Sequence, residues 1–382
     1  MTGKNIYISV INDLVTDQRV QRIAGTLKDA GFRPVLIGRR FRHSPELRHK
    51  NIEYRRFRLL FNRGFLFYAS YNVRLFLFLL SRKEISLLVS NDLDTLPANF
   101  LVSRIRKKSL VYDSHEYFTE VPELIDRKFV KRFWEKLEKF LVPKVDFACT
   151  VNETLAKLYS AKYGIAFHVI RNLPDKTGPI IDYHIPDHLS GLKLILYQGS
   201  VNRDRGLEEM MELLTDLPYA ALIIAGDGDV LNELKLYARE LNLEDRIFFA
   251  GRLCPMKLKS LTSKVHLGIS LEKKTNMNYF YALPNKLFDY IQACVPIVCS
   301  GFPEMKRILD EYEVGISVDP SDRGKLKKTI EMALNDEELR ETWKRNCQVA
   351  SEILSWKNEQ KELIYLYKKA GMVFPEEFEN KE

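Results

Sequence analysis

Two separate series of alternating strand and helix patterns run along this chain, and a segment without periodicity divides them. In residues 1–172, short β-rich runs alternate with amphipathic stretches, as they do in parallel α/β units. Residues 173–191 contain three prolines and two glycines, which is typical of a linker. A second series fills residues 192–355, and we expect the final helix, in residues 356–382, to cross back to the first domain. The sequence therefore predicts an α/β protein with two doubly wound parallel sheets.

The strands of each series follow from short apolar runs bounded by turn residues. The first series predicts strands at Ile6–Ile11, Pro34–Gly38, Ile85–Ser90, Leu110–Tyr112, Phe147–Val151 and Phe167–Ile170. The second predicts strands at Lys193–Gln198, Ala220–Ala225, Ile247–Ala250, Val265–Ser270, Ile297–Cys299 and Ile316–Val318. Doubly wound sheets bind ligands beyond the carboxyl ends of their strands. We therefore expect the functional residues in the loops after these strands, around an interdomain cleft.

Positive charge is concentrated near the start of the chain. The net charge is +8, and residues 19–84 alone hold 16 Arg and Lys against 4 Asp and Glu. Such a region attracts phosphates, nucleic acid or an anionic membrane surface. Within it lies the longest apolar segment, Phe57–Leu80, but Arg58, Arg63 and Arg74 interrupt it and exclude a spanning helix. Two interpretations stay open: a helix packed on the first sheet, or a helix lying partly in a membrane interface.

The five cysteines predict a reducing compartment. None belongs to a CxxC pair, and three of them, Cys149, Cys294 and Cys299, lie in apolar runs. A disulfide framework or a zinc site is therefore disfavoured, and we expect a cytoplasmic protein.

The segment richest in groups suited to chemistry is NMNYFYALPNKLFDYIQACVPIV, residues 276–298. Asn285 is a suitable cap for a helix that starts there. Lys286 and Asp289 are three residues apart and share one face near the first turn. A helix N-terminus with a lysine suits a diphosphate, and a carboxylate one turn later can accept ribose hydroxyls. Alternatively, Asp289 only complements the helix dipole and Lys286 is solvated.

The stretch DYIQACVPIV, from Asp289 to Val298, resembles the EAMAxGxPVI signature of the family-four retaining glycosyltransferases (glycosyl transferases group 1). These enzymes have the GT-B fold of two Rossmann-like domains, and their acidic residue at this place holds the nucleotide ribose. The family has a second Glu eight residues earlier, where this chain has Tyr281, and YALPN replaces its EGFG. LPNKLFDY also resembles LPNKLFEY of a bacterial polysaccharide-type branch. The resemblance implies donor contacts from Asp289, Tyr281, and the backbone around Leu283 and Asn285.

The segment YQGSVNRDRGLEEMMELL resembles the GR-x4-KG phosphate loop of the same family. A strand enters a glycine-containing turn and a helix, which leaves backbone amides to face phosphate. Gly199 and Gly206 keep the family spacing, and Arg205 stands where the family has Lys. Ser200 stands where the family has Arg, so we expect Arg203 to compensate from the same loop. Without the resemblance, Arg205 would be interpreted as a solvated loop residue.

Two further turns, IIAGDGD and RIFFAGR, resemble the two segments of the family that line the pocket for the base and the ribose. The resemblance implies that Gly226 lies at the donor. The simpler interpretation of this glycine is a turn requirement.

In the first series, VYDSHEYF places acidic side chains and one histidine just after a strand. It resembles the family segment whose His lines the sugar pocket, which implies that His115 contacts the donor sugar. The alternative is a hydrogen-bonded loop histidine. Beside it, Glu116 is a candidate on the acceptor side.

Two other first-series segments offer acceptor-side groups. SNDLDTLPA follows a strand and presents Asn91, Asp92 and Asp94, although Asp92 or Asp94 could instead cap the following helix. INDLVTDQRV resembles an opening of the same branch; in it we expect Asp17 to cap a helix and Arg19 to face an acceptor phosphate.

Taken together, the resemblance implies retaining transfer of a sugar from a nucleoside diphosphate sugar to a hydroxyl. His115, Arg205 and Lys286 are the expected catalytic residues, with Arg205, Lys286 and helix amides stabilising the leaving diphosphate. No metal and no cofactor is expected. The basic, aromatic first domain points to a lipid-linked or polysaccharide-precursor acceptor, and hence to a cytoplasmic protein peripheral at the inner membrane face.

Other function classes have specific signatures. No GxGxxG follows the first strand and no GxxxxGK[ST] is present, which disfavours dinucleotide oxidoreductases and P-loop nucleotidases. A sugar-nucleotide 2-epimerase of the same fold is the alternative enzyme. A basic membrane- or nucleic-acid-binding protein is the non-enzymatic alternative, and no nucleic-acid motif supports a nucleic-acid partner.

Overall fold

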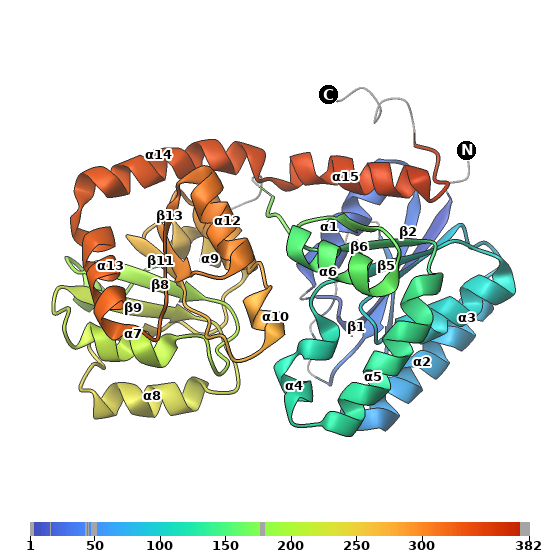
Figure 1. The fold of residues 1–382 in the computed structure, drawn as a ribbon, viewed down its shortest axis with the longest axis horizontal. Helices are drawn as coiled ribbons and strands as arrows, with labels where there is room; N and C mark the ends of the chain where they lie inside the picture. Colours follow the sequence, from blue (N-terminus) through green and yellow to red (C-terminus); the bar gives the residue numbers. More distant parts are fainter. Residues whose placement is uncertain are drawn as a thin grey trace. The chain divides into compact units, whose positions relative to one another are not determined.

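The computed structural model describes residues 4–15, 17–42, 44, 46, 52–175 and 180–374. They divide into two compact units (Figure 1). The first unit comprises the described parts of 1–172 and 357–382, and the second those of 173–356. Each unit is built around one parallel sheet.

The first unit contains a seven-stranded parallel sheet with the order β3-β2-β1-β4-β5-β6-β7. Its strands are β1 (Asn5–Asp13), β2 (Arg33–Arg39), β3 (Glu53–Phe57), β4 (Leu87–Asn91), β5 (Leu110–Ser114), β6 (Phe147–Thr150) and β7 (Phe167–Val169). The order reverses between β1 and β4, which are hydrogen-bonded neighbours. Such a switch point is where doubly wound sheets bind ligands, and the polar loop after β4 starts there.

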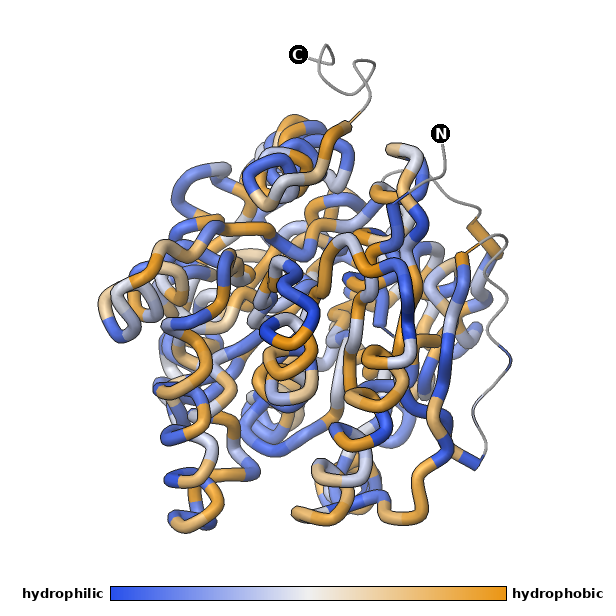
Figure 2. The backbone as a smooth tube through the Cα atoms, turned by 90° about the vertical axis from the view of Figure 1, so that its right-hand side faces the viewer, coloured by the Kyte–Doolittle hydropathy of each residue, from blue (hydrophilic) through white to orange (hydrophobic). Residues whose placement is uncertain are grey.

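Helices cover this sheet: α1 (Gln18–Asp29), α2 (Gly64–Leu80), α3 (Leu96–Arg106), α4 (Pro122–Ile125), α5 (Lys128–Leu141), α6 (Glu153–Tyr163) and α15 (Trp356–Lys369). Along the helices on the side that faces the viewer in Figure 2, hydrophobic and hydrophilic residues follow one another, as in helices that bury one face. The Asp17 carboxylate accepts from the Val20 amide at 3.1 Å and caps α1, which confirms the capping prediction. Thr16, beside it, lies outside the described residues.

The end of the chain completes the first unit. Glu359 of α15 accepts hydrogen bonds from the backbone and side chain of Arg171 at 2.5 and 3.0 Å. Thr26 of α1 bonds to Gln360 at 3.4 Å, and Figure 1 shows α15 lying across α1. The rings of Phe32 and Phe374 meet edge to face at 4.9 Å.

The second unit contains a six-stranded parallel sheet with the order β10-β9-β8-β11-β12-β13. Its strands are β8 (Lys193–Gln198), β9 (Ala220–Ala225), β10 (Ile247–Phe249), β11 (Leu267–Ser270), β12 (Ile297–Ser300) and β13 (Gly315–Val318). Its helices are α7 (Leu207–Leu214), α8 (Leu231–Glu240), α9 (Pro255–Thr262), α10 (Met277–Phe280), α11 (Asn285–Gln292), α12 (Pro303–Tyr312), α13 (Arg323–Asn335) and α14 (Glu337–Ile353). Here the switch point lies between β8 and β11.

Alternate residues along the strands of the second sheet belong to two hydrophobic cores, one on each face of the sheet. Ile195 and Tyr197 of β8 belong to the core under α7 and α13. Leu194 and Leu196 of the same strand belong to the core under α11 and α12. This period of two is what a strand buried on both faces requires, and it explains why the strands read as continuous apolar runs.

The proline-rich segment interpreted as a linker packs against the second unit. Among its described residues, Tyr183 donates its amide to Ser260 at 3.0 Å, and Asp182 pairs with Lys264 at 2.5 Å. Both contacts attach the segment to α9 and the turn after it, so it clusters with residues 173–356.

The structure of the segment Phe57–Leu80 differs in part from both interpretations of the sequence, a helix packed on the first sheet and a helix lying partly in a membrane interface. Phe57 ends the edge strand β3, and the helix α2 begins only at Gly64. One face of α2 packs on the sheet through Phe67, Tyr71 and two leucines, and the Tyr71 hydroxyl donates to the Val10 carbonyl at 2.7 Å. The opposite face leaves Phe65 exposed. Over the described ranges, no helix has the length and apolar character to cross a membrane.

Candidate functional site

A buried carboxylate joins two cations at the carboxyl end of the second sheet. Glu272, two residues beyond β11, is fully buried. Its Oε1 accepts from Arg205 Nη1 at 3.2 Å and from Lys286 Nζ at 3.0 Å, and its Oε2 accepts from Ser270 Oγ at 2.8 Å. Arg205 comes from the loop after β8, and Lys286 from the first turn of α11. Three segments distant in sequence therefore meet at one carboxyl group.

The charges of this cluster depend on each other. Burial opposes ionisation of Glu272, but Lys286 and Arg205 outweigh it and hold the pKa of the carboxyl at about 2. Burial lowers the pKa of Lys286 to about 8, with Glu272 opposing that shift and Arg205 adding to it. Burial also acts against the charge of Arg205, but Glu272 raises the pKa of the guanidinium above its ordinary value. With Lys286 protonated, the cluster carries a net charge of +1 and attracts anions.

Aromatic rings fix both cations further. Lys286 Nζ lies 4.1 Å from the centroid of the Tyr197 ring, and Arg205 Cζ lies 4.2 Å from that of Tyr279. Both distances are within the range of cation–π attraction. Among the described residues, the buried Nε of Arg205 has no hydrogen-bond partner, so one donor of the guanidinium is unused.

Three glycines allow the loops around this cluster to pack. A Cβ at Gly206 would lie 2.1 Å from the Leu271 carbonyl oxygen, just before Glu272. A Cβ at Gly226 would lie 1.8 Å from the Gly199 carbonyl oxygen. Close approach of the two loops therefore explains Gly226 better than a turn requirement. Gly199 itself has a φ of 131°, which only glycine adopts readily.

Asp289 is attached to the end of β8. Its Oδ2 accepts from Gln198 Nε2 at 2.8 Å, and Gln198 Oε1 accepts from the Thr262 hydroxyl at 2.8 Å. The predicted cap of this helix is wrong. Pro284 occupies the N-cap position of α11, Asn285 is the first helical residue, and no side chain caps the helix.

Arg203 was expected to compensate for Ser200 from the same loop. The Arg203 side chain is exposed and pairs with Glu233 of α8 at 3.5 Å. Lys286 lies beside the loop instead, with its Cε 3.5 Å from the position of a Cβ at Gly199. Ser200 is exposed, and its carbonyl accepts from the Tyr197 hydroxyl at 2.6 Å.

The other two expected donor contacts come from the segment before α11. Tyr281 is half-buried, and its ring meets that of Phe280 at 5.0 Å. Leu283 is buried in the core under α11.

In the first unit, His115 lies between two carboxylates. Its Nδ1 is 3.4 Å from Asp92 Oδ2 and its Nε2 is 3.4 Å from Asp113 Oδ2, while Nε2 also lies 3.1 Å from Asn91 Oδ1. Burial lowers the pKa of the imidazole, but Asp92 and then Asp113 outweigh it and raise the pKa to about 9. His115 is therefore an imidazolium near neutral pH, a donor of hydrogen bonds from both nitrogens.

Arg19 has a different partner from the one expected. Its guanidinium is 3% exposed and binds both oxygens of Asp113, at 3.0 and 2.7 Å, and the Ile170 carbonyl at 2.6 Å. The prediction that it faces an acceptor phosphate is therefore wrong. Burial would raise the pKa of Asp113, but Arg19 and His115 hold it well below its ordinary value.

The loop after β4 holds the remaining first-unit candidates. Asn91 is fully buried and donates to the Ser9 carbonyl at 2.9 Å, and Glu116 is exposed. Asp92, with a φ of 58°, accepts from the His115 amide at 2.8 Å. Neither Asp92 nor Asp94 caps α3, because its N-cap is Thr95 and the Ala98 amide donates to Asn72. The alternative that these aspartates only cap the helix is wrong.

Sequence reasoning missed Glu272. The signal was available, because GISLE places an acidic residue just after a buried strand, as VYDSHE places Asp113 near the end of one. No motif includes it, and its partners lie 67 and 14 residues away.

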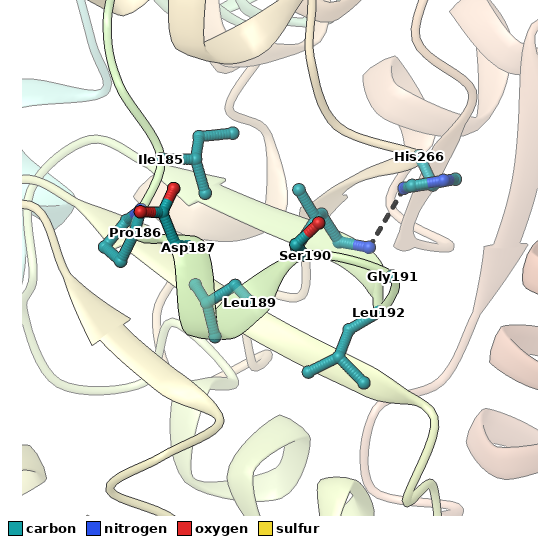
Figure 3. A pocket seen from close by; sticks show the side chains of 9 residues that line it. Ile185, Pro186, Asp187, Leu189, Ser190, Gly191, Leu192 and His266 are labelled. Atoms are coloured by element: carbon teal, nitrogen blue, oxygen red, sulfur yellow. Dashed lines mark hydrogen bonds between the residues drawn. The ribbon is translucent and has the colours of Figure 1, made fainter.

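A pocket of about 300 Å³ in the second unit lies elsewhere (Figure 3). Its walls come from the turn before β8 and from His266, just before β11, so it is at the amino ends of the strands. His266 Nδ1 accepts from the Leu194 amide at 3.0 Å, the dashed line in Figure 3. None of the charged residues described above lines it.

Comparisons with known proteins cover most of the chain. Residues 17–175 match the family model described as Glycosyltransferase Family 4, and residues 185–349 match the one described as Glycosyl transferases group 1. The chain belongs to this glycosyltransferase family. The family that the resemblance of DYIQACVPIV implied is thereby confirmed.

Curated relatives of this glycosyltransferase match over short stretches. Alpha-monoglucosyldiacylglycerol synthase from Streptococcus pneumoniae is 20% identical over 129 residues, 33% of this chain and 28% of the relative. Alpha-D-kanosaminyltransferase from Streptomyces kanamyceticus is 24% identical over 158 residues, 40% and 39% of the two chains. The chain thus spans less than half of the length of these curated relatives.

Solved structures match over nearly the whole glycosyltransferase chain. Sucrose-phosphate synthase from Thermosynechococcus elongatus has a TM-score of 0.77 at 16% identity, covering 96% of this chain and 98% of its own. HepE from Anabaena, in complex with UDP and glucose, has a TM-score of 0.73 at 15% identity, covering 96% and 99%. These likenesses and the two parallel-sheet domains confirm the predicted GT-B fold.

Proposed function

We propose that this protein transfers a sugar, with retention, from a nucleoside diphosphate sugar to an acceptor hydroxyl. The observation that carries the proposal is the buried cluster of Arg205, Glu272 and Lys286 at the switch point of the second sheet. The bond between the anomeric carbon and the phosphate oxygen breaks, and its electron pair leaves with the diphosphate. The acceptor oxygen forms the new bond on the same face, and its proton passes to the leaving phosphate oxygen.

The leaving diphosphate needs fixed positive charge. Arg205 and Lys286 supply it, and α11 adds the partial positive charge of a helix N-terminus next to Lys286. Asn285 and the backbone around Leu283 lie at the start of this helix, with Tyr281 beside them. In the proposal, these residues face the donor. A solved neighbour, HepE, is a complex with UDP and glucose. Asp289 holds the ribose, and its bond to Gln198 fixes the carboxylate at the end of β8.

His115 contacts the donor sugar in this proposal. An imidazolium held between Asp92 and Asp113 donates hydrogen bonds and does not accept a proton, so it orients a hydroxyl and does not act as a base. Asn91, Asp92, Asp17 and Glu116 are the proposed acceptor-side groups. The relatives named above are transferases or synthases, which favours transfer over the 2-epimerase alternative.

The acceptor is lipid-linked or a polysaccharide precursor, presented at an anionic membrane surface. The exposed face of α2 continues onto α5, because the rings of Phe65 and Phe133 meet at 6.3 Å. Phe65 is 70% exposed and Phe129, at the start of α5, is 87% exposed. The same two helices and the residues just before them carry exposed basic side chains: Arg63, Arg127, Lys128, Arg132, Lys136 and Lys139. Aromatic rings bordered by cations suit the interface of an anionic bilayer.

A thermal-shift titration with UDP, GDP, ADP and CMP and their sugars, in EDTA, tests the donor. A nucleotide at about 100 times its dissociation constant stabilises the fold by about 2.7 kcal/mol. We expect one of the nucleotides to raise the melting temperature, and Arg205→Ala or Asp289→Ala to abolish the rise. The same titration with added Mg²⁺ tests the expectation that no metal is needed. Absence of any shift under both conditions would contradict the proposal.

Vesicle co-sedimentation tests the membrane surface. We expect binding to phosphatidylglycerol vesicles, weaker binding to phosphatidylcholine vesicles, and a loss of about tenfold for the double variant Phe65→Ser/Phe129→Ser. Leu236→Ser, on the exposed face of α8, is the matched control. Equal binding by the double variant and the control would place the contact elsewhere.

A further inference from the structure

We propose that Glu272 is a positioning residue of the diphosphate subsite, bridging Arg205 and Lys286 so that both cations face one anion. This inference rests on the function proposed above. It assigns a role to a residue that no motif of the family resemblance includes.

Glu272 is held from every side. Its Oε1 binds the two cations, its Oε2 binds Ser270 of β11, and its backbone carbonyl accepts from Ser300 of β12 at 2.6 Å. The carboxylate has no exposed surface, so it acts on a substrate through the cations and not by contact. A carboxylate with such fixed partners sets the positions of Arg205 and Lys286 before any ligand binds.

The carboxylate also determines how much positive charge the subsite contains. Lys286 faces three groups, the carboxylate of Glu272, the guanidinium of Arg205 and the ring of Tyr197. Burial and Arg205 both favour the neutral amine, and Glu272 is the charged group that favours the ammonium. Without Glu272, Lys286 therefore loses its proton near neutral pH and the subsite retains one cation.

Glu272 also affects the position of Lys286. Its Oε1 accepts from Lys286 Nζ at 3.0 Å, and this attraction is lost when a neutral amide replaces the carboxylate. Lys286 lies close to the loop after β8, with its Cε 3.5 Å from the place where a side chain at Gly199 would begin. Glu272 thus provides the attraction that keeps Lys286 beside the loop after β8.

The experiment is calorimetric binding of UDP to the wild type and to Glu272→Gln between pH 7 and 9.5. The wild type is expected to lose affinity as the pH rises through about 8, where Lys286 deprotonates. Glu272→Gln is expected to bind UDP about tenfold or more weakly than the wild type at pH 7, and its affinity should not change with pH. The ratio of the wild-type affinity to the variant's affinity should therefore shrink towards pH 9.5. Glu209→Gln, which breaks a neighbouring ion pair with Lys273, is the matched control and keeps the wild-type profile.

Several outcomes would overturn the proposal. A constant ratio at every pH would indicate general damage to the fold, and tighter binding by Glu272→Gln would show that the carboxylate only competes with the ligand. If Glu272→Gln does not fold, Lys286→Arg provides the test in its place. Arginine does not titrate in this range, so the loss of affinity near pH 8 should disappear, and its persistence contradicts the inference.

The proposed function and this inference can fail separately. If the wild type binds none of UDP, GDP, ADP or CMP, the nucleotide donor is wrong, and inorganic pyrophosphate replaces UDP in the same comparison. Pyrophosphate binding with the predicted dependence on Glu272 would keep the subsite. Absence of pyrophosphate binding would overturn both.

Discussion

At the scale of the residue, His115 is held in its charged form by two carboxylates. Asp92 and Asp113 raise its pKa to about 9, against the effect of burial. Because this value lies above the ordinary 6.5, the imidazolium stabilises the fold fully below about pH 6.5, and this contribution is lost as the pH rises through about 9. Arg19 stays charged throughout that range and keeps Asp113 ionised.

We expect His115→Gln to unfold at a lower urea concentration than the wild type. The difference should be about 2 kcal/mol at pH 6 and should narrow by pH 9.5. Urea titrations across this range measure it, with His184→Gln, an exposed histidine paired with Asp187, as the control. A difference that stays constant with pH would show that the pair of carboxylates does not hold the charge.

Single residues show where sequence reasoning stops. Asp17 could be identified as a cap, because its partner amide is three residues away. The burial of Arg19 could not, because its partner Asp113 lies 94 residues along the chain. The role of Glu272 depends in the same way on Arg205, a contact that only the folded sheet creates.

At the scale of the element, buried strands were predictable and exposed ones were not. The bounds of β8 and β9 agree with the expected strands, because both faces of each strand are apolar. The strand β3, with the sequence EYRRF, lies at the edge of its sheet and has one buried residue, so it carries no apolar pattern. Edge strands with charged side chains are the ones that periodicity cannot find.

Helix ends provide a second prediction. Glu313 ends α12 with a φ of 48°, in the left-handed region where a side chain costs about 1–2 kcal/mol. We expect Glu313→Gly to raise stability by about 0.5–1 kcal/mol, since glycine removes that strain but adds flexibility to the unfolded chain. Thermal unfolding measures the change.

The reverse substitution is the control for this prediction. Gly164 ends α6 with a φ of 69° and has no neighbouring atom within 4 Å of a built Cβ. Gly164→Ala should lower stability by about 1 kcal/mol, because the space is available but the backbone conformation is unfavourable. Equal effects of the two substitutions in the same direction would contradict the argument from backbone strain.

At the scale of the whole molecule, each series of the sequence forms its own sheet. The local alternation of strands and helices was sufficient to predict two doubly wound sheets, because parallel strands need helical crossovers. The fold of each unit could therefore be predicted from the local sequence pattern. The ion pair between Arg171 and Glu359 could not be predicted in this way, since 188 residues separate its partners.

That ion pair gives a third prediction. Glu359 is 3% exposed, and Arg171 also donates its amide to the same carboxylate. We expect Glu359→Ala to lower the stability of the first unit by about 2 kcal/mol, because the amide and the guanidinium of Arg171 lose their shared acceptor. Hydrogen exchange resolved by segment measures it, and the strands of the second unit should keep their protection. Equal loss of protection in both units would contradict the assignment of this contact to the first unit.

The first unit uses both ends of the chain, and this has a consequence for synthesis. Residues 173–356 form a complete second unit, in which the amide of Trp356 donates to the carbonyl of Pro174 at 3.1 Å and closes the segment on itself. The second unit is thus an insertion within the first. On the ribosome, the inserted unit has all of its residues before the first unit receives α15, so the half of the protein that is translated first is the last to become complete.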